Sequence, residues 1–283
     1  MTSQVRFVRR LVSIIGADDA TGLAAEMAYH SLFALFPFLL FLAALLGFIG
    51  ERVGTRDLFS KAMELITLLA PPEVQQVLAD WTAAMLGTRS PGLLSVGAIG
   101  ALWGAAGGTG TLIKGLNRAY GVKETRPAWK KIGLQLGATV GIGTATAVGV
   151  GLSLAGQWAS QGLQNIPFLT IELRGVVELA RGPGVALGLG LILWLLYTLL
   201  PNTETRCWST LPGAMFATLA WVALTAGFSF YLVKGGLPGW TFGSLSVGVV
   251  LMLWLYFVGL ILIIGGEINA LLSGRREAEE SGS

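Results

Sequence analysis

The polar residues of this chain that could do chemistry lie within or at the ends of long apolar runs. In the first run, Glu26, Tyr29 and Pro37 share one helical stripe with His30 and Phe33, at spacings of three and four residues. An acidic side chain at the centre of a bilayer costs about 2.5 kcal/mol or more, so it usually faces a bundle interior or a water-filled cavity. The stripe predicts a site for an ion, a proton or a lipid headgroup. A helix-end acid that pairs with a basic residue only for folding is the alternative.

Two further polar pairs are predicted at the same membrane depth as Glu26. Asn117 and Arg118 follow the second apolar run, and Glu267 and Asn269 lie near the end of the last one, in the sequence GGEINA. Acids, amides and an arginine at one end of a bundle fit a salt-bridged gate and equally a static latch. We therefore predict a transport or gating cluster that consists of Glu26, Tyr29, Asn117, Arg118, Glu267 and Asn269.

Pro37 is expected to kink the first helix, because a proline leaves the carbonyl four residues earlier without its hydrogen bond. The kink is either a hinge or a structural feature only. No metal or cofactor is expected, since the chain has one cysteine, Cys207, and one histidine, His30. The sequence GGTG in the second run lacks the Gly-Lys-Ser/Thr that completes a phosphate-binding loop.

The elements that must position these residues are transmembrane helices. The chain has 283 residues, of which 12% are charged, about half of the roughly 25% that is usual in soluble domains. Between Gly235 and Gly266 no charged residue occurs, over more than the roughly 20 residues that cross a bilayer. A backbone in hydrocarbon must satisfy its own hydrogen bonds, so the apolar runs are expected to be helices. There are six: 22–49, 92–113, 132–156, 184–200, 211–233 and 243–272.

Basic residues predict the orientation of these six spans. Twelve of the nineteen Lys and Arg residues fall on the side that holds both termini, and six of them lie in the loop 114–131. Because cytoplasmic loops carry an excess of Lys and Arg, we place this loop and both termini in the cytoplasm. Loop 114–131 is expected to meet anionic lipid headgroups. The net charge of +3 is modest, and no nucleic-acid partner is expected.

The segments outside the six runs predict an all-α membrane protein with one membrane domain, residues 1–273. Residues 1–20 are expected to form a basic amphipathic helix on the inner leaflet. A signal peptide is the alternative, although the segment lacks the continuous apolar core and the cleavage site. We expect a helical hairpin on the outer face at residues 51–91, and a disordered cytoplasmic tail at residues 274–283.

Glycines recur every four residues on two of the predicted helices. Small residues at this spacing let helix backbones approach closely. We therefore predict two packing faces, formed by Gly100, Gly104 and Gly108 and by Gly133, Gly137 and Gly141. Such faces serve packing within a protomer or between protomers, so a homo-oligomer stays open.

Five motifs occur in order along the chain: AYHSLFALFPFLL, LNRAYG, LLYTLLPN, LPGA and FGSLSVGVVLMLWLYFVGLILIIGGEINA. Together they resemble the YihY/BrkB family, over nearly the whole chain. One departure is Phe242, where that family commonly shows Tyr. The resemblance implies a six-helix bacterial inner-membrane protein, linked in some members to virulence, for which transport has been proposed. It also brings a ribonuclease label, which the residues do not support, because metal-dependent RNA hydrolysis needs a His and Asp ligand cluster.

Three classes of function compete on this sequence. A transporter or permeation pathway for an ion, small solute or lipid fits the intramembrane acids, the glycine-rich helices and Pro37. A non-transporting envelope scaffold, which organises lipids or partners, fits the outer hairpin and the basic loop. A lipid-modifying membrane enzyme would need a nucleophile or metal set, and the sequence shows none with suitable spacing. We expect a transporter and no enzyme activity.

Overall fold

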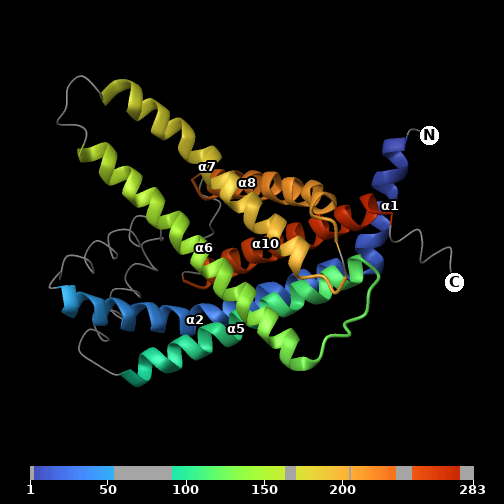
Figure 1. Ribbon diagram of the computed structural model, residues 1–283, viewed down its shortest axis with the longest axis horizontal. Coiled ribbons are helices and arrows are strands. Elements are labelled where there is room, and N and C mark those ends of the chain that lie inside the picture. The colour runs from blue at the N-terminus through green and yellow to red at the C-terminus, as the bar shows by residue number, and fades with distance from the viewer. Residues whose placement is uncertain (1–2, 54–90, 163–169, 204, 234–243, 275–283) are drawn as a thin grey trace. The chain divides into compact units, whose positions relative to one another are not determined.

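The computed structural model describes residues 3–53, 91–162, 170–203, 205–233 and 244–274, and these residues contain helices and no strand (Figure 1). The helices are α1 (Ser3–Ala17), α2 (Ala20–Val53), α5 (Pro91–Ala119), α6 (Ala128–Gly162), α7 (Thr170–Leu199), the 3-10 helix η2 (Cys207–Thr210), α8 (Leu211–Val233) and α10 (Ser244–Leu272). The predicted all-α class is therefore confirmed for the described residues.

Each of the six predicted apolar runs lies in one of the long helices, apart from a terminal residue or two. The main difference concerns α7, which begins at Thr170 rather than near residue 184. Its first turns, TIELRGVVELARG, consist largely of good helix formers. Their charged residues interrupt the apolar run, so a search for apolar runs does not detect this part of the helix. The predicted hairpin at 51–91 and the tail at 274–283 lie almost entirely outside the described residues.

Among the residues that the structure describes, three helical stretches have the length and apolar composition needed to cross a membrane. They are Ser95–Ala119, Cys207–Tyr231 and Gly248–Leu272, and Gly184–Leu199 is a shorter apolar segment. Many apolar side chains outside the core are exposed, for example Leu187 at 75% and Leu219 at 67%. Large exposed apolar surface on long helices is typical of contact with lipid. These features support the predicted membrane protein.

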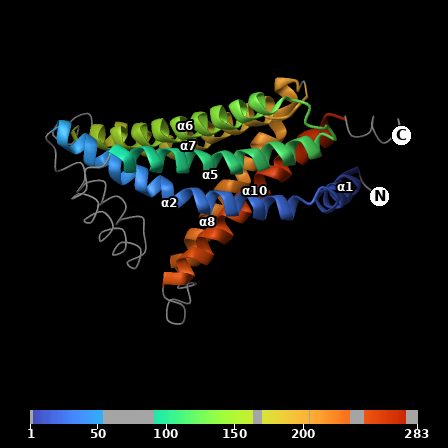
Figure 2. The same ribbon diagram turned by 90° about the horizontal axis from the view of Figure 1, so that it is seen from below.

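The described helices form two compact units, which we treat separately. The first unit contains the described parts of Met1–Ala24, Thr109–Ala226 and Val258–Ser283. The second contains those of Ala25–Gly108 and Gly227–Phe257. Within the first unit, α6 and α7 are antiparallel neighbours, and both views show them side by side (Figures 1 and 2).

In the second unit, α5 packs on α2 through glycines. A β-carbon added to Gly100 would lie 2.8 Å from Cβ of Pro37, and one added to Gly104 would lie 2.8 Å from Cα of Ala34. Both distances are too short for a side chain, so only glycine permits this approach. At Gly108 the nearest atom, in Ser31, is 3.7 Å away, which is an ordinary contact.

The other predicted glycine face has no packing partner within the described chain. No atom lies within 4 Å of a β-carbon added to Gly133, Gly137 or Gly141. The reason is that α6 meets α5 through another face, where Thr139 shares a hydrogen bond of 2.9 Å with Thr109. Residues two positions apart on a helix are turned by about 200°, so the glycines point away from this contact. A packing role for them inside the described protomer is not observed.

Candidate functional site

In the first unit, α8 and α10 meet where each presents a glycine. A β-carbon on Gly213 would collide with the carbonyl oxygen of Gly265 and would lie 2.5 Å from Nδ2 of Asn269. A β-carbon on Gly265 would lie 2.9 Å from the carbonyl oxygen of Gly213 and would collide with the hydroxyl of Tyr197. The two backbones therefore come into direct contact, which places the polar side chains of α10 against the start of α8.

Asn269 uses this contact to cap α8. The first turn of a helix has amide groups without partners inside the helix. The amide of Gly213 donates to Oδ1 of Asn269 at 2.7 Å, and the preceding Pro212 has no amide hydrogen to satisfy. Asn269 is fully buried, and its Nδ2 has no hydrogen-bond partner among the described residues. Oδ1 of Asn269 thus serves as a structural acceptor, while its Nδ2 donates no hydrogen bond within the described chain.

Glu267 is also fully buried, but it faces another helix. On α10 it lies between Ile263 and Ala270, four residues before it and three after it, on one stripe. Ile263 comes within 3.4 Å of a β-carbon added to Gly115, and Ala270 packs with Ala119 of α5. The carboxyl group of Glu267 therefore belongs to the α5–α10 contact, whereas Asn269 belongs to the α8–α10 contact.

Tyr197 adds α7 to the same region. It is 1% exposed, and its hydroxyl donates to the carbonyl of Leu262 on α10 at 2.8 Å. Three helices, α5, α7 and α8, thus pack on the C-terminal half of α10. A carboxyl group enclosed in this way can hold a proton or neutralise a cation.

Asn117 lies at the end of α5, where the helix stops on a Schellman motif. Gly121 has a φ of +66°, its amide donates to the carbonyl of Arg118 at 2.9 Å, and the amide of Val122 donates to that of Asn117 at 2.8 Å. The left-handed conformation at this position favours glycine. The turn directs the chain back, so that Glu124 accepts a hydrogen bond of 3.0 Å from Nδ2 of Asn117.

Four side chains, Asn117, Glu124, Arg126 and Asn202, then tie the α5–α6 loop to the end of α7, and we call them the loop clamp. The backbone amide of Asn202 donates to Oδ1 of Asn117 at 2.7 Å. Its side-chain amide donates to the carbonyl of Lys123 at 2.9 Å and to the hydroxyl of Thr125 at 2.8 Å.

Arg126 completes the loop clamp by capping α7. Its guanidinium donates to the carbonyl of Leu200 at 2.9 Å and to that of Pro201 at 2.5 Å, and its backbone amide donates to Glu124 at 3.1 Å. A cation at a helix C-terminus is favourable, because the last carbonyls have no partners in the helix. Sequence reasoning found Asn117 but missed the roles of Glu124, Arg126 and Asn202. The only signal was the Pro-Asn that closes the LLYTLLPN motif.

The remaining predicted residues lie elsewhere. Arg118 is exposed, and its guanidinium donates to the carbonyl of Asp18, between α1 and α2, at 3.1 Å. Glu26 and Tyr29 belong to the second unit, where Glu26 is half-buried and Tyr29 is 56% exposed and stacks on Phe33 with ring centroids 6.0 Å apart. Pro37 lies inside the continuous helix α2. The six predicted cluster residues are thus distributed over both units. The four in the first unit occupy four separate places, namely the loop clamp, the α1–α2 junction, the α5–α10 contact and the α8–α10 contact.

Known proteins are similar to this chain along nearly its whole length. The family profile described as "Virulence factor BrkB" matches residues 11–283. The chain belongs to the BrkB family. The match confirms the resemblance seen in the sequence motifs, and it includes every part of α2 through α10 that the structure describes.

Individual relatives of this BrkB-family chain include two that are named membrane proteins. YfkH of Bacillus subtilis (strain 168), named ribonuclease-like, is 32% identical over 275 residues, with 96% of each chain covered. UPF0761 membrane proteins of Azoarcus sp. (strain BH72) and Aromatoleum aromaticum are each 24% identical. The chain spans less than two thirds of these two relatives, 63% and 65% of their lengths. No solved structure matches the chain significantly.

Proposed function

We propose that this BrkB-family protein is a six-span protein of the bacterial inner membrane that acts as a transporter or permeation pathway. Its substrate would be an ion, a small polar solute or a lipid. The six spans would be α2, α5, α6, α7, α8 and α10, with both termini and loop 114–131 in the cytoplasm. An even number of spans returns the chain to its starting side. In the first unit, the C-terminal ends of α5 and α10 lie toward the same side as α1, which supports this topology (Figure 2).

The observation that carries the transport proposal is the burial of Glu267. This residue is 0% exposed in α10, a helix that is otherwise almost entirely apolar. An ionisable residue at membrane depth is expensive, and such residues commonly mark ion or proton pathways. The glycine contacts around it keep four helices close enough for small helix movements to change its surroundings.

A non-transporting scaffold is the second candidate, and the loop clamp favours it. The hydrogen bonds of Asn117, Arg126 and Asn202 hold loops and helix ends together, which is a structural role. For both candidate functions, transporter and scaffold, we propose a protein without enzyme activity. Among the described residues, no three His, Cys, Asp or Glu side chains lie close enough to hold a metal ion, the arrangement that a metal-dependent ribonuclease would use.

Flux measurements on reconstituted protein test the proposal. The purified chain is placed in vesicles, and flux of protons, monovalent cations and small anions is followed with fluorescent indicators, beside protein-free vesicles. We expect the wild-type protein to conduct one of these probes. The variant Glu267→Gln should lose that flux, while its size-exclusion profile stays unchanged. Glu73→Gln, in the predicted outer loop, removes one acid as a control and should transport normally.

Two results would count against the proposal, the first against the role of Glu267 and the second against transport itself. Normal flux in a folded Glu267→Gln protein would show that Glu267 is not on the pathway. No flux for any probe, together with a partner that co-purifies in fixed stoichiometry, would favour the scaffold.

A further inference from the structure

Four of the six basic residues of loop 114–131 fall into two groups. Arg118 and Arg126 donate to backbone carbonyls of their own protein, so their guanidinium groups serve the fold. Lys130, at the start of α6, is exposed, and its ammonium lies 5.2 Å from the ring centroid of Trp129. Lys131 follows it and is half-buried. The second group is therefore available to a partner outside the protein.

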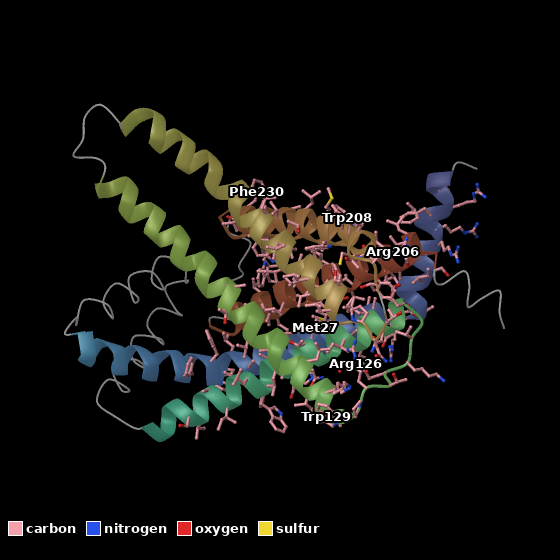
Figure 3. All side chains as sticks on the ribbon, in the orientation of Figure 1. Met27, Arg126, Trp129, Arg206, Trp208 and Phe230 are labelled. Atoms are coloured by element: carbon pink, nitrogen blue, oxygen red, sulfur yellow. The ribbon has the colours of Figure 1, made fainter. Side chains whose placement is uncertain are left out.

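Two exposed tryptophans accompany these lysines in the same unit. Trp129 is 70% exposed, and Trp208, in η2, is 83% exposed with the exposed Arg206 beside it. Figure 3 shows Trp129 at the start of α6 and Arg206 and Trp208 before α8. Indole rings are enriched at the membrane–water interface, because one part is apolar and the N–H is polar. Tryptophan next to a basic residue thus occurs twice on this unit.

The turn that presents Trp208 is held firmly. Nε1 of Trp194 donates to the carbonyl of Cys207 at 2.6 Å, and both the backbone amide and the hydroxyl of Ser209 donate to the carbonyl of Arg206, at 2.9 and 2.7 Å. Thr210 is fully buried and also donates to Cys207. The exposure of Trp208 is therefore fixed by its neighbours rather than by a loose loop.

Two acids of this unit, Glu124 and Asp19, accept hydrogen bonds within the protein. The carboxylate of Glu124 accepts from Asn117 and from the amide of Arg126, and that of Asp19 accepts from the amide of Gly22, which begins α2. These oxygens compete less for the lysines than solvent-facing carboxylates would. Each of the two places, at the start of α6 and at η2, thus combines positive charge with an indole ring, which is the chemistry that recognises phosphate groups at an apolar boundary.

We propose a headgroup surface that binds anionic phospholipids in preference to zwitterionic ones. It consists of two parts, Trp129, Lys130 and Lys131 at the start of α6 and Arg206 and Trp208 before α8. The lysines at the start of α6 and the arginine before η2 contact separate phosphodiesters, and the indole rings lie at headgroup depth beside the acyl chains. This binding depends on the membrane placement proposed above and not on transport.

Lipid titration of the purified full-length protein tests the headgroup surface. Thermal unfolding in a neutral detergent is measured with added phosphatidylglycerol, phosphatidylcholine or inorganic phosphate, and native mass spectrometry counts the lipids retained. We expect a saturable rise in Tm with phosphatidylglycerol only. The variant Lys130→Gln, Lys131→Gln, Arg206→Gln should lose this rise and the retained lipid, while its Tm without lipid stays unchanged.

A charge-matched variant separates a specific surface from general positive charge. Arg52→Gln, Arg56→Gln, Arg89→Gln removes three basic residues from the predicted outer side and should keep the full phosphatidylglycerol effect. Equal loss in both triple variants would overturn the headgroup surface, as would no effect in the wild type. An equal effect of inorganic phosphate would show a free-anion site instead. Flux does not enter these readouts, so a failure of transport would leave this result intact.

Discussion

Replacing Gly213 with alanine tests the contact between α8 and α10 most directly. The new β-carbon would collide with the carbonyl oxygen of Gly265 and would lie 2.5 Å from Nδ2 and 2.6 Å from Cγ of Asn269. The asparagine could move by rotating its side chain, but that would break its hydrogen bond to the amide of Gly213. The carbonyl is part of the backbone of α10, so one of the two helices must shift.

The size of the effect follows from these contacts. Overpacking a close-packed site costs about 1–3 kcal/mol. Loss of the hydrogen bond between Gly213 and Asn269 adds about 0.5–1.5 kcal/mol. The better helix propensity of alanine returns up to about 1 kcal/mol. We expect a net decrease of about 0.5–4.5 kcal/mol in the free energy of unfolding.

The assay is reversible unfolding of the purified protein in mixed micelles, followed by tryptophan fluorescence. Gly188→Ala is the matched control, because it lies within a helix and no atom is within 4 Å of its added β-carbon. The control should be neutral or slightly stabilised. If Gly213→Ala were as stable as Gly188→Ala, the direct backbone contact between α8 and α10 would be refuted.

Two further changes address the loop clamp and the end of α5. Arg126→Lys keeps the charge but cannot donate to the carbonyls of Leu200 and Pro201 with a planar fork, so stability should fall by about 1–3 kcal/mol, measured by the same unfolding assay. Lys130→Ala, an exposed neighbour, should leave it unchanged. Gly121→Ala forces a side chain into a left-handed conformation with a φ of +66° and should cost about 1–2 kcal/mol, whereas Gly121→Asn should recover part of that loss.

Much of the helical framework could be predicted from the sequence, because long apolar runs have one stable form in hydrocarbon. The start of α7 could not, since its charged residues conceal a helix that continues beyond the apolar run. The glycine face of α5 was predicted from its spacing, and Gly100 and Gly104 do contact α2. The same spacing on α6 gave no contact in the described chain, because spacing alone does not say which face a neighbour occupies.

The candidate site was harder to predict for a related reason. Periodicity places Glu267 on a stripe of α10, but the helix that this stripe meets depends on tertiary packing. The loop clamp joins Asn117 to Glu124, seven residues away, and to Asn202, eighty-five residues away. Pairings at such a separation leave no local pattern in a single sequence. The Pro-Asn after α7 marks a turn, but it does not identify the partners of Asn202.

The burial of Glu267 has opposite consequences in the two candidate functions. Movement of α10 that exposed Glu267 through rotation would break the hydrogen bonds from Tyr197 to Leu262 and from Gly213 to Asn269. At about 0.5–1.5 kcal/mol each, loss of both bonds would cost about 1–3 kcal/mol, which falls within the few kcal/mol that separate functional states of proteins. Glutamine has nearly the same shape as glutamate and cannot ionise. In a transporter, Glu267→Gln should therefore abolish flux while the protein stays folded, whereas a scaffold should show no flux with either side chain at this position.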